Sequence, residues 1–92
     1  MITAKTNDGF EIELDEDFLD DAEMMEEVLA ANDNMTKIFI MRDHMLDAEG
    51  KKRLYDHLRN EKGKVLFSAL DAAIGELLNS FQAGKNSASS PN

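Results

Sequence analysis

The densest group of potential ligand atoms is the acidic run Asp-Glu-Asp-Phe-Leu-Asp-Asp over residues 15–21. A calcium loop needs oxygen ligands at alternate positions and a glycine at its sixth position. Counted from Asp15, the fifth position is Leu19 and the sixth is Asp20, so one ligand and the turn glycine are missing. We therefore predict no metal site, and we expect these acids to lie at a helix start, where they complement the helix dipole.

Other residue types that could carry chemistry are scattered along the chain. His44 and His57 are the only histidines and there is no cysteine, whereas a zinc site normally uses three or more protein ligands. Ser68 and Ser80 have no histidine close in sequence and no nucleophile elbow around them. The sequence thus predicts neither an enzyme nor a cofactor.

Methionine is concentrated in one part of the chain. Methionine fills irregular gaps in cores, and it also forms adaptable binding surfaces. Met24 and Met41 lie off the main apolar stripes of their predicted helices, so we expect them to be the surface members of the group. Nearby carboxylates would border such a patch, which would suit an amphipathic helix of a partner. The five methionines of this region are Met24, Met25, Met35, Met41 and Met45.

Charge is divided unevenly between the two halves. The whole chain has a net charge of −9; residues 1–36 hold twelve acids and one base, whereas residues 37–92 hold seven acids and nine bases. An acidic half repels the phosphate backbone, so we predict no nucleic-acid binding and favour a basic protein partner. The longest wholly apolar stretch, residues 38–41, is far too short to span a membrane, so we expect a soluble protein.

Two kinds of hydrophobic period indicate the elements that must position these residues. Residues 2–6 and 10–14 alternate around Asn7-Asp8-Gly9, which predicts a β-hairpin. From residue 17 the period becomes helical, and it predicts about four helices with breaks near residues 32–34, 47 and 63. The first predicted helix has its stripe at Phe18, Ala22, Met25, Val28 and Leu29, and the last at Leu66, Leu70, Ala73, Ile74, Leu77, Leu78 and Phe81.

The fold class expected from these patterns is mainly α. A short N-terminal β-hairpin (1–15) is followed by a compact helical bundle (16–83), and the two form a single domain over residues 1–83. Residues 84–92, Gly-Lys-Asn-Ser-Ala-Ser-Ser-Pro-Asn, contain one apolar residue and are expected to form a flexible, disordered tail.

The second half of the chain resembles the tail assembly chaperones of long-tailed bacteriophages, especially actinobacterial siphophages. The resemblance begins at Met-Leu-Asp-Ala-Glu-Gly-Lys-Lys-Arg-Leu-Tyr-Asp-His-Leu-Arg over residues 45–59. It continues through the charged turn over 60–64, a last helix containing Ala-Ile-Gly-Glu-Leu-Leu at 73–78, and the Gly-Lys-Asn-Ser start of the tail at 84–87. Residues 35–92 carry it, whereas the acidic front half is similar only in general character.

The resemblance implies a protein of the host cytoplasm that is absent from the mature virion. Such chaperones bind the long helical tape measure protein and keep it soluble while tail tube protein polymerises around it. The family is commonly made in two forms through a programmed frameshift, and the Gly84-Lys85 codons would suit a slippery sequence. A homo-oligomer is compatible with this function, and neither a membrane nor a nucleic acid takes part in it.

An adaptable apolar groove with a charged border would suit such a partner. Our hypothesis assigns the apolar contacts to Met24, Met25, Val28, Met41 and Met45, and the steering of basic segments to Glu23, Glu26 and Glu27. The alternative is an acidic inhibitor or adaptor protein that occupies a basic site on a host protein. Its binding would weaken steeply as salt rises, whereas apolar capture would be much less sensitive.

Overall fold

The chain begins with the expected antiparallel hairpin. The computed structural model describes residues 1–89, with side chains described as far as residue 86. Strand β1 (Ile2–Lys5) pairs with β2 (Glu11–Leu14) in the register that places Ile2 opposite Leu14. Gly9 in the connecting turn has a φ of 99°, a conformation that side chains other than glycine rarely adopt.

Helices follow the hairpin, and three of them start at an aspartate. Asp21, Asp33 and Asp47 each accept hydrogen bonds from backbone N–H groups of the following turn, which would otherwise have no partner. The described residues thus form the expected hairpin followed by four α-helices. The helical elements are the 3₁₀ turn η1 (Phe18–Asp20), α1 (Ala22–Ala30), α2 (Asn34–Met45), α3 (Ala48–Leu58) and α4 (Phe67–Ser89).

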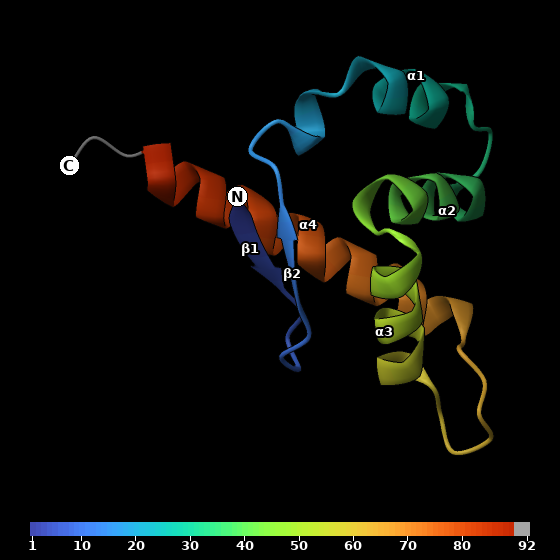
Figure 1. Ribbon diagram of the computed structural model, residues 1–92. Helices are drawn as coiled ribbons and strands as arrows, with labels where there is room; N and C mark the ends of the chain where they lie inside the picture. The colour runs from blue at the N-terminus through green and yellow to red at the C-terminus, as the bar shows by residue number, and fades with distance from the viewer. Residues whose placement is uncertain (90–92) are drawn as a thin grey trace.

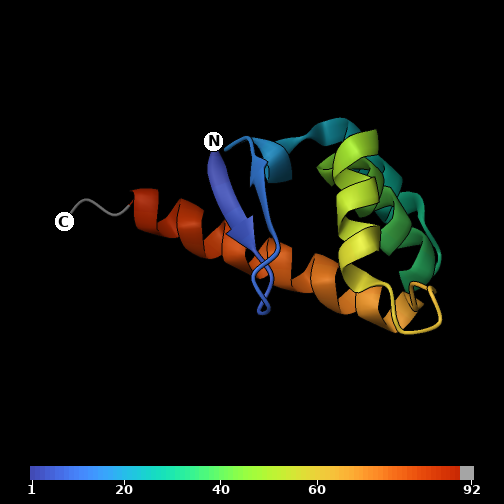
Figure 2. The ribbon, with the colours of Figure 1, turned by 60° about the horizontal axis from the view of Figure 1, so that its bottom comes forward.

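Helix α4 carries the largest share of the core. It has 23 residues and is about 35 Å long, and the hairpin lies along it in both views (Figures 1 and 2). The strands turn alternate side chains, among them Ile2 and Ile12, into the core that α4 shares, and α2 and α3 pack toward the other end of α4. The predicted stripe of α4 is confirmed by its buried side chains Leu70, Ala73, Ile74, Leu77 and Phe81.

Polar contacts hold the hairpin to α4. The Ser80 hydroxyl oxygen accepts the N–H of Lys5 at 2.9 Å, and Glu76 Oε1 accepts the N–H of Asn7 at 2.8 Å. Lys85 Nζ donates to the carbonyl oxygen of Glu16 at 3.0 Å. The Ser80 hydroxyl, which we considered as a nucleophile, thus joins the edge of β1 to the helix.

The C-terminal boundary differs from the expected one. Helix α4 continues through Gly84 to Ser89, whereas the sequence placed the start of a flexible tail at Gly84. Gly84 lies against the hairpin, where an added Cβ would come within 2.8 Å of Ile2 Cγ2. The glycine thus permits close packing inside the helix instead of ending it. The expected tail over residues 90–92 lies outside the described part of the chain.

Aromatic and guanidinium groups join α2, α3 and the start of α4. Phe39 meets Phe67 edge to face, with 5.6 Å between the ring centroids. The Arg42 guanidinium lies 4.9 Å from the centroid of Phe39 and donates to the Tyr55 hydroxyl oxygen at 2.7 Å. Arg42 therefore packs against the Phe39 ring and has the Tyr55 hydroxyl as a polar partner.

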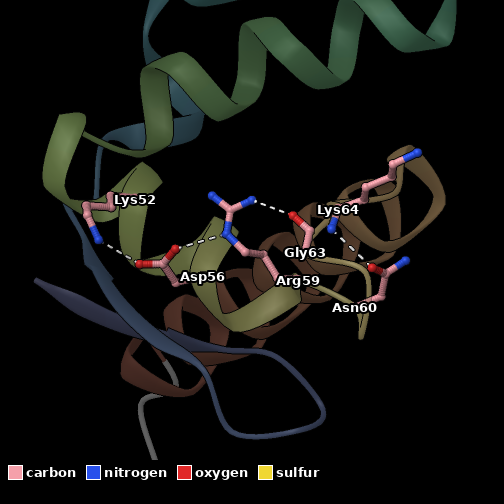
Figure 3. Close-up of polar contacts among 6 residues, drawn as sticks. All are labelled: Lys52, Asp56, Arg59, Asn60, Gly63 and Lys64. Carbon is pink, nitrogen blue, oxygen red and sulfur yellow. Dashed lines mark hydrogen bonds and ion pairs between the residues drawn. The ribbon is translucent and has the colours of Figure 1, made fainter.

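The turn between α3 and α4 is closed by its own hydrogen bonds (Figure 3). Asn60 Oδ1 accepts the backbone N–H groups of Lys62 and Lys64, and Arg59 Nη1 donates to the carbonyl oxygen of Gly63 at 3.0 Å. Gly63, expected to end the third helix, has a φ of 79° in this turn. Across residues 1–89, no helix combines the length and hydrophobicity needed to cross a membrane.

Candidate partner-binding groove

An open apolar groove of about 240 Å³ lies at α1 and α2. Helix α1 packs against α2 and lies away from the hairpin–α4 core (Figures 1 and 2). Every side chain that lines the groove is apolar, and half of them are methionines. These side chains are Leu19, Met24, Met25, Val28, Leu29 and Met41.

The face of α1 that is buried is not the one predicted. Met24, expected at the surface, is only 3% exposed, whereas Met25 is 47% exposed and Leu29 is 81% exposed. Val28 is half-buried, and it lies one turn after Met24, which places both side chains on the side that faces α2. The groove is therefore floored by Met24 and Val28 and walled on the outside by Met25 and Leu29.

The error has a local cause. The predicted stripe ran without interruption from Phe18 through Ala22 into the rest of the helix, but Phe18 belongs to η1. Asp21 has extended backbone angles and caps a new helix at Ala22, with its Oδ1 accepting the N–H groups of Glu23 and Met24. Because the chain leaves helical geometry at residue 21, the angular phase of the stripe is lost there.

The two methionines of α2 have different roles. Met41 is half-buried and lines the groove, as the partner-binding hypothesis requires. Met45 is 6% exposed and belongs to the central core with Leu54 and Leu77. Four of the five apolar residues in the hypothesis thus share the groove, and Met45 lies apart from it.

Carboxylates border the groove on α1. Glu23, Glu26 and Glu27 are all exposed, in agreement with the sequence hypothesis. Glu27 Oε2 lies 3.0 Å from His44 Nε2, so this pair links α1 to α2. With that one side chain engaged, Glu23 and Glu26 remain the acids best placed to meet basic groups of a partner.

Sequence reasoning did not place Leu19 and Leu29 in the groove. Leu29 was assigned to the buried stripe, and the error in helix phase explains its misplacement. Leu19 lies in η1, which is too short to give a periodic signal. The available clue was the apolar content of residues 18–29. Seven of these twelve residues are apolar, whereas in a helix buried on one side about half of the residues are apolar.

A second cavity of about 440 Å³ opens over the acidic run. Glu16 pairs with the N-terminal amino group at 3.1 Å, which lowers the pKa of Glu16, and Asp21 is the cap of α1.

His57 Nε2 lies 3.0 Å from Asp8 Oδ2, a contact that joins α3 to the hairpin turn. No cluster of three or more His, Cys, Asp or Glu side chains in the described structure has the arrangement to hold a metal ion.

Comparisons with protein-family models, with curated proteins and with solved structures found no match. The resemblance of residues 35–92 to tail assembly chaperones therefore stays a prediction from the order of the sequence motifs. The groove, in contrast, follows from the geometry of the chain itself.

Proposed function

We propose that this protein is a phage tail assembly chaperone that holds an apolar helical segment of the tape measure protein in the groove of α1 and α2. The observation that carries the proposal is the groove itself: six apolar side chains, three of them methionines, line an open surface beside exposed carboxylates. A binding function agrees with the sequence, which predicts no catalytic site.

The chemistry of the groove suits a partner that must be held and later released. Methionine side chains are unbranched and flexible, so one surface accommodates different apolar residues along a repetitive helix. Each apolar side chain that is fully buried contributes about 1.5–3 kcal/mol, and part of this is lost to the entropy of association. A groove of about 240 Å³ holds only a few side chains, so binding is moderate and release is fast.

The charges beside the groove select the kind of segment. Glu23 and Glu26 favour basic residues next to the apolar stripe of the partner, and the acidic front half keeps the protein soluble. In the proposed function the protein acts in the host cytoplasm while tail tube protein polymerises around the tape measure, and it leaves before the virion is complete. A longer form made by frameshifting would require a slippery heptamer near the Gly84 and Lys85 codons, which sequencing of the gene tests.

The first experiment identifies the partner. The protein, tagged at its N-terminus, is isolated from phage-producing cells, and the retained proteins are identified by mass spectrometry. We expect a tape measure protein or a tail tube protein. Recovery of a host enzyme or a DNA-binding protein alone would instead support the acidic inhibitor.

A variant of the groove tests the site. Replacing Met41 with glutamate places a charge in an apolar surface, so we expect binding of a labelled tape measure peptide to weaken at least about tenfold, a loss of about 1.4 kcal/mol or more. Fluorescence polarisation measures the affinity, and circular dichroism checks the fold. Leu66→Glu is the matched control, because Leu66 is 51% exposed and does not line the groove. Equal binding by the two variants would refute the assignment of the groove.

The acidic inhibitor remains the second candidate because of one observation. Twelve of the 19 acids lie within residues 1–36, and several of them surround the cavity of about 440 Å³. Raising the salt concentration separates the two functions: charge-driven binding falls steeply, whereas capture in the apolar groove changes little.

A further inference from the structure

Charges of opposite sign gather in different segments of the chain. Residues 15–27, which include the first two-thirds of α1, contain eight acids and no Lys or Arg. Residues 51–64, which include most of α3 and the following turn, contain six bases and two acids. In Figure 1, α2 and α3 lie between helix α1 and the α3–α4 turn, so the two charged segments form separate surfaces of one copy.

A small notch opens beside the basic turn. It has a volume of about 160 Å³, and all its lining side chains are aliphatic or aromatic. The edge-to-face contact of Phe39 with Phe67 fixes one wall, and Leu66, half of whose surface is exposed, stands at the rim. The lining residues are Phe39, Tyr55, Val65, Leu66, Phe67 and Leu70.

The turn presents two lysines at this rim. Asn60 Oδ1 accepts the backbone N–H of Lys62 at 2.9 Å and that of Lys64 at 3.1 Å. The Lys64 side chain extends away from the turn in Figure 3. Lys52 and Arg59 both pair with Asp56. Among the described residues, no carboxylate pairs with the amino groups of Lys62 or Lys64, so both remain available to a partner.

Helix α1 carries the complementary surface. Met25 and Leu29 lie one helical turn apart, with 47% and 81% of their surfaces exposed. Glu23 and Glu26 are exposed beside them. The same chain therefore has an apolar ridge flanked by acids on α1 and an apolar notch flanked by bases at the α3–α4 turn.

We propose that copies of this protein associate head to tail, with the Met25–Leu29 ridge of one copy seated in the notch of the next. Leu29 enters between Leu66 and Tyr55, and Glu26 and Glu23 approach Lys62 and Lys64. Because ridge and notch lie on different parts of the molecule, each copy has one free ridge and one free notch, and association leads to open chains or rings. The contact is small, so assembly depends on protein concentration and weakens with salt.

Association and partner capture use overlapping residues. Met25 and Leu29 also form the outer wall of the groove, so a bound partner helix and a second copy compete for them. This competition rests on the proposed function, whereas the association itself does not. Lys62 and Lys64 lie outside the groove, so changing them separates the two activities.

Sedimentation velocity over about 10–500 µM protein in low salt tests the association, because a contact of this size has micromolar or weaker affinity. We expect the wild type to show a concentration-dependent increase in mass. The donor variant Leu29→Glu and the acceptor variant Lys62→Glu/Lys64→Glu should each stay monomeric. Mixed in equal amounts, they should form one-to-one dimers and nothing larger, because only one intact ridge and one intact notch can meet.

Matched variants make the result decisive. Lys5→Glu/Lys37→Glu makes the same change of net charge at two exposed lysines away from the notch, and it should associate like the wild type. The acceptor variant should bind the tape measure peptide as well as the wild type does, whereas Met41→Glu should associate normally and lose the peptide. A wild type that is monomeric throughout, or a mixture that forms no dimer, would overturn the head-to-tail contact and leave the proposed function standing.

Discussion

Asp56 is the carboxylate with the most basic surroundings (Figure 3). It accepts Lys52 Nζ at 2.7 Å and Arg59 Nε at 3.2 Å, and these hydrogen bonds lower its pKa. A carboxyl with a lower pKa in the folded state stabilises the fold above its unfolded pKa, and this contribution is lost as pH falls through the folded pKa. Asp56 therefore contributes stability at neutral pH that disappears in acid.

The substitution Asp56→Asn isolates this contribution. We expect it to be slightly less stable than the wild type at pH 7, and we expect the difference to vanish as pH falls below about 4 and the wild-type carboxyl is protonated. Urea unfolding followed by circular dichroism at several pH values measures it. Glu61→Gln in the turn that follows α3 is the control, since no ion pair involving Glu61 is found in the described residues. A stability difference that is the same at every pH would contradict the prediction.

Single residues also show where sequence patterns lose their power. Met24 and Met25 are neighbours of the same type, and only the phase of α1 decides which of them is buried. That phase is set by Asp21, whose capping of Ala22 separates α1 from η1. The residue types of the candidate groove could therefore be predicted, but the face on which each lies could not.

At the scale of elements, the glycines of α4 give a direct test of packing. An alanine at Gly84 would place its Cβ 2.8 Å from Ile2 Cγ2, and a branched side chain in a strand cannot easily move away. Alanine in a helix interior is otherwise favoured over glycine by about 1 kcal/mol. We expect Gly84→Ala to lower the free energy of unfolding despite this gain, because β1 must shift.

Gly75 supplies the comparison within the same helix. An added Cβ there meets no atom within 4 Å, so Gly75→Ala should stabilise the protein by up to about 1 kcal/mol. Thermal unfolding of both variants measures the two effects. If Gly84→Ala were stabilising as well, the result would contradict the close packing of β1 against α4 at Gly84.

The hairpin and α4 were the most predictable elements. Apolar residues alternate with polar ones on both sides of Gly9, and they recur with the helical period of 3.6 over residues 70–81. Both patterns are strong local signals. The end of α4 was less predictable, because Gly84 lies against Ile2 and Lys85 donates to the Glu16 carbonyl oxygen, and no local pattern reveals these distant residues. Contacts between distant segments override local preferences at such positions.

At the scale of the whole molecule, one buried side chain of the central core joins α4 to η1. Phe81 is completely buried, and its ring meets Phe18 of η1 at 5.9 Å. Replacing it with alanine should cost about 3–5 kcal/mol, a large part of the stability of a small domain. Leu66→Ala, at a half-exposed position outside the core, should change stability by less than about 1 kcal/mol. Urea unfolding measures the loss of unfolding free energy in both variants. Similar losses would contradict the placement of Phe81 in the core.

The contact of β1 with α4 also sets the order in which the chain folds. Lys5 and Ser80, which hydrogen-bond across this contact, are separated by 75 positions. A ribosome releases the hairpin first, but a hairpin alone is marginal in water, and α4, which covers it, is made only after the other three helices. The apolar side chains of the strands therefore stay exposed on the nascent chain until α4 has left the ribosome. The hairpin reaches its final packing only after α4 has been synthesised, and truncation within α4 removes the surface on which the first strand depends.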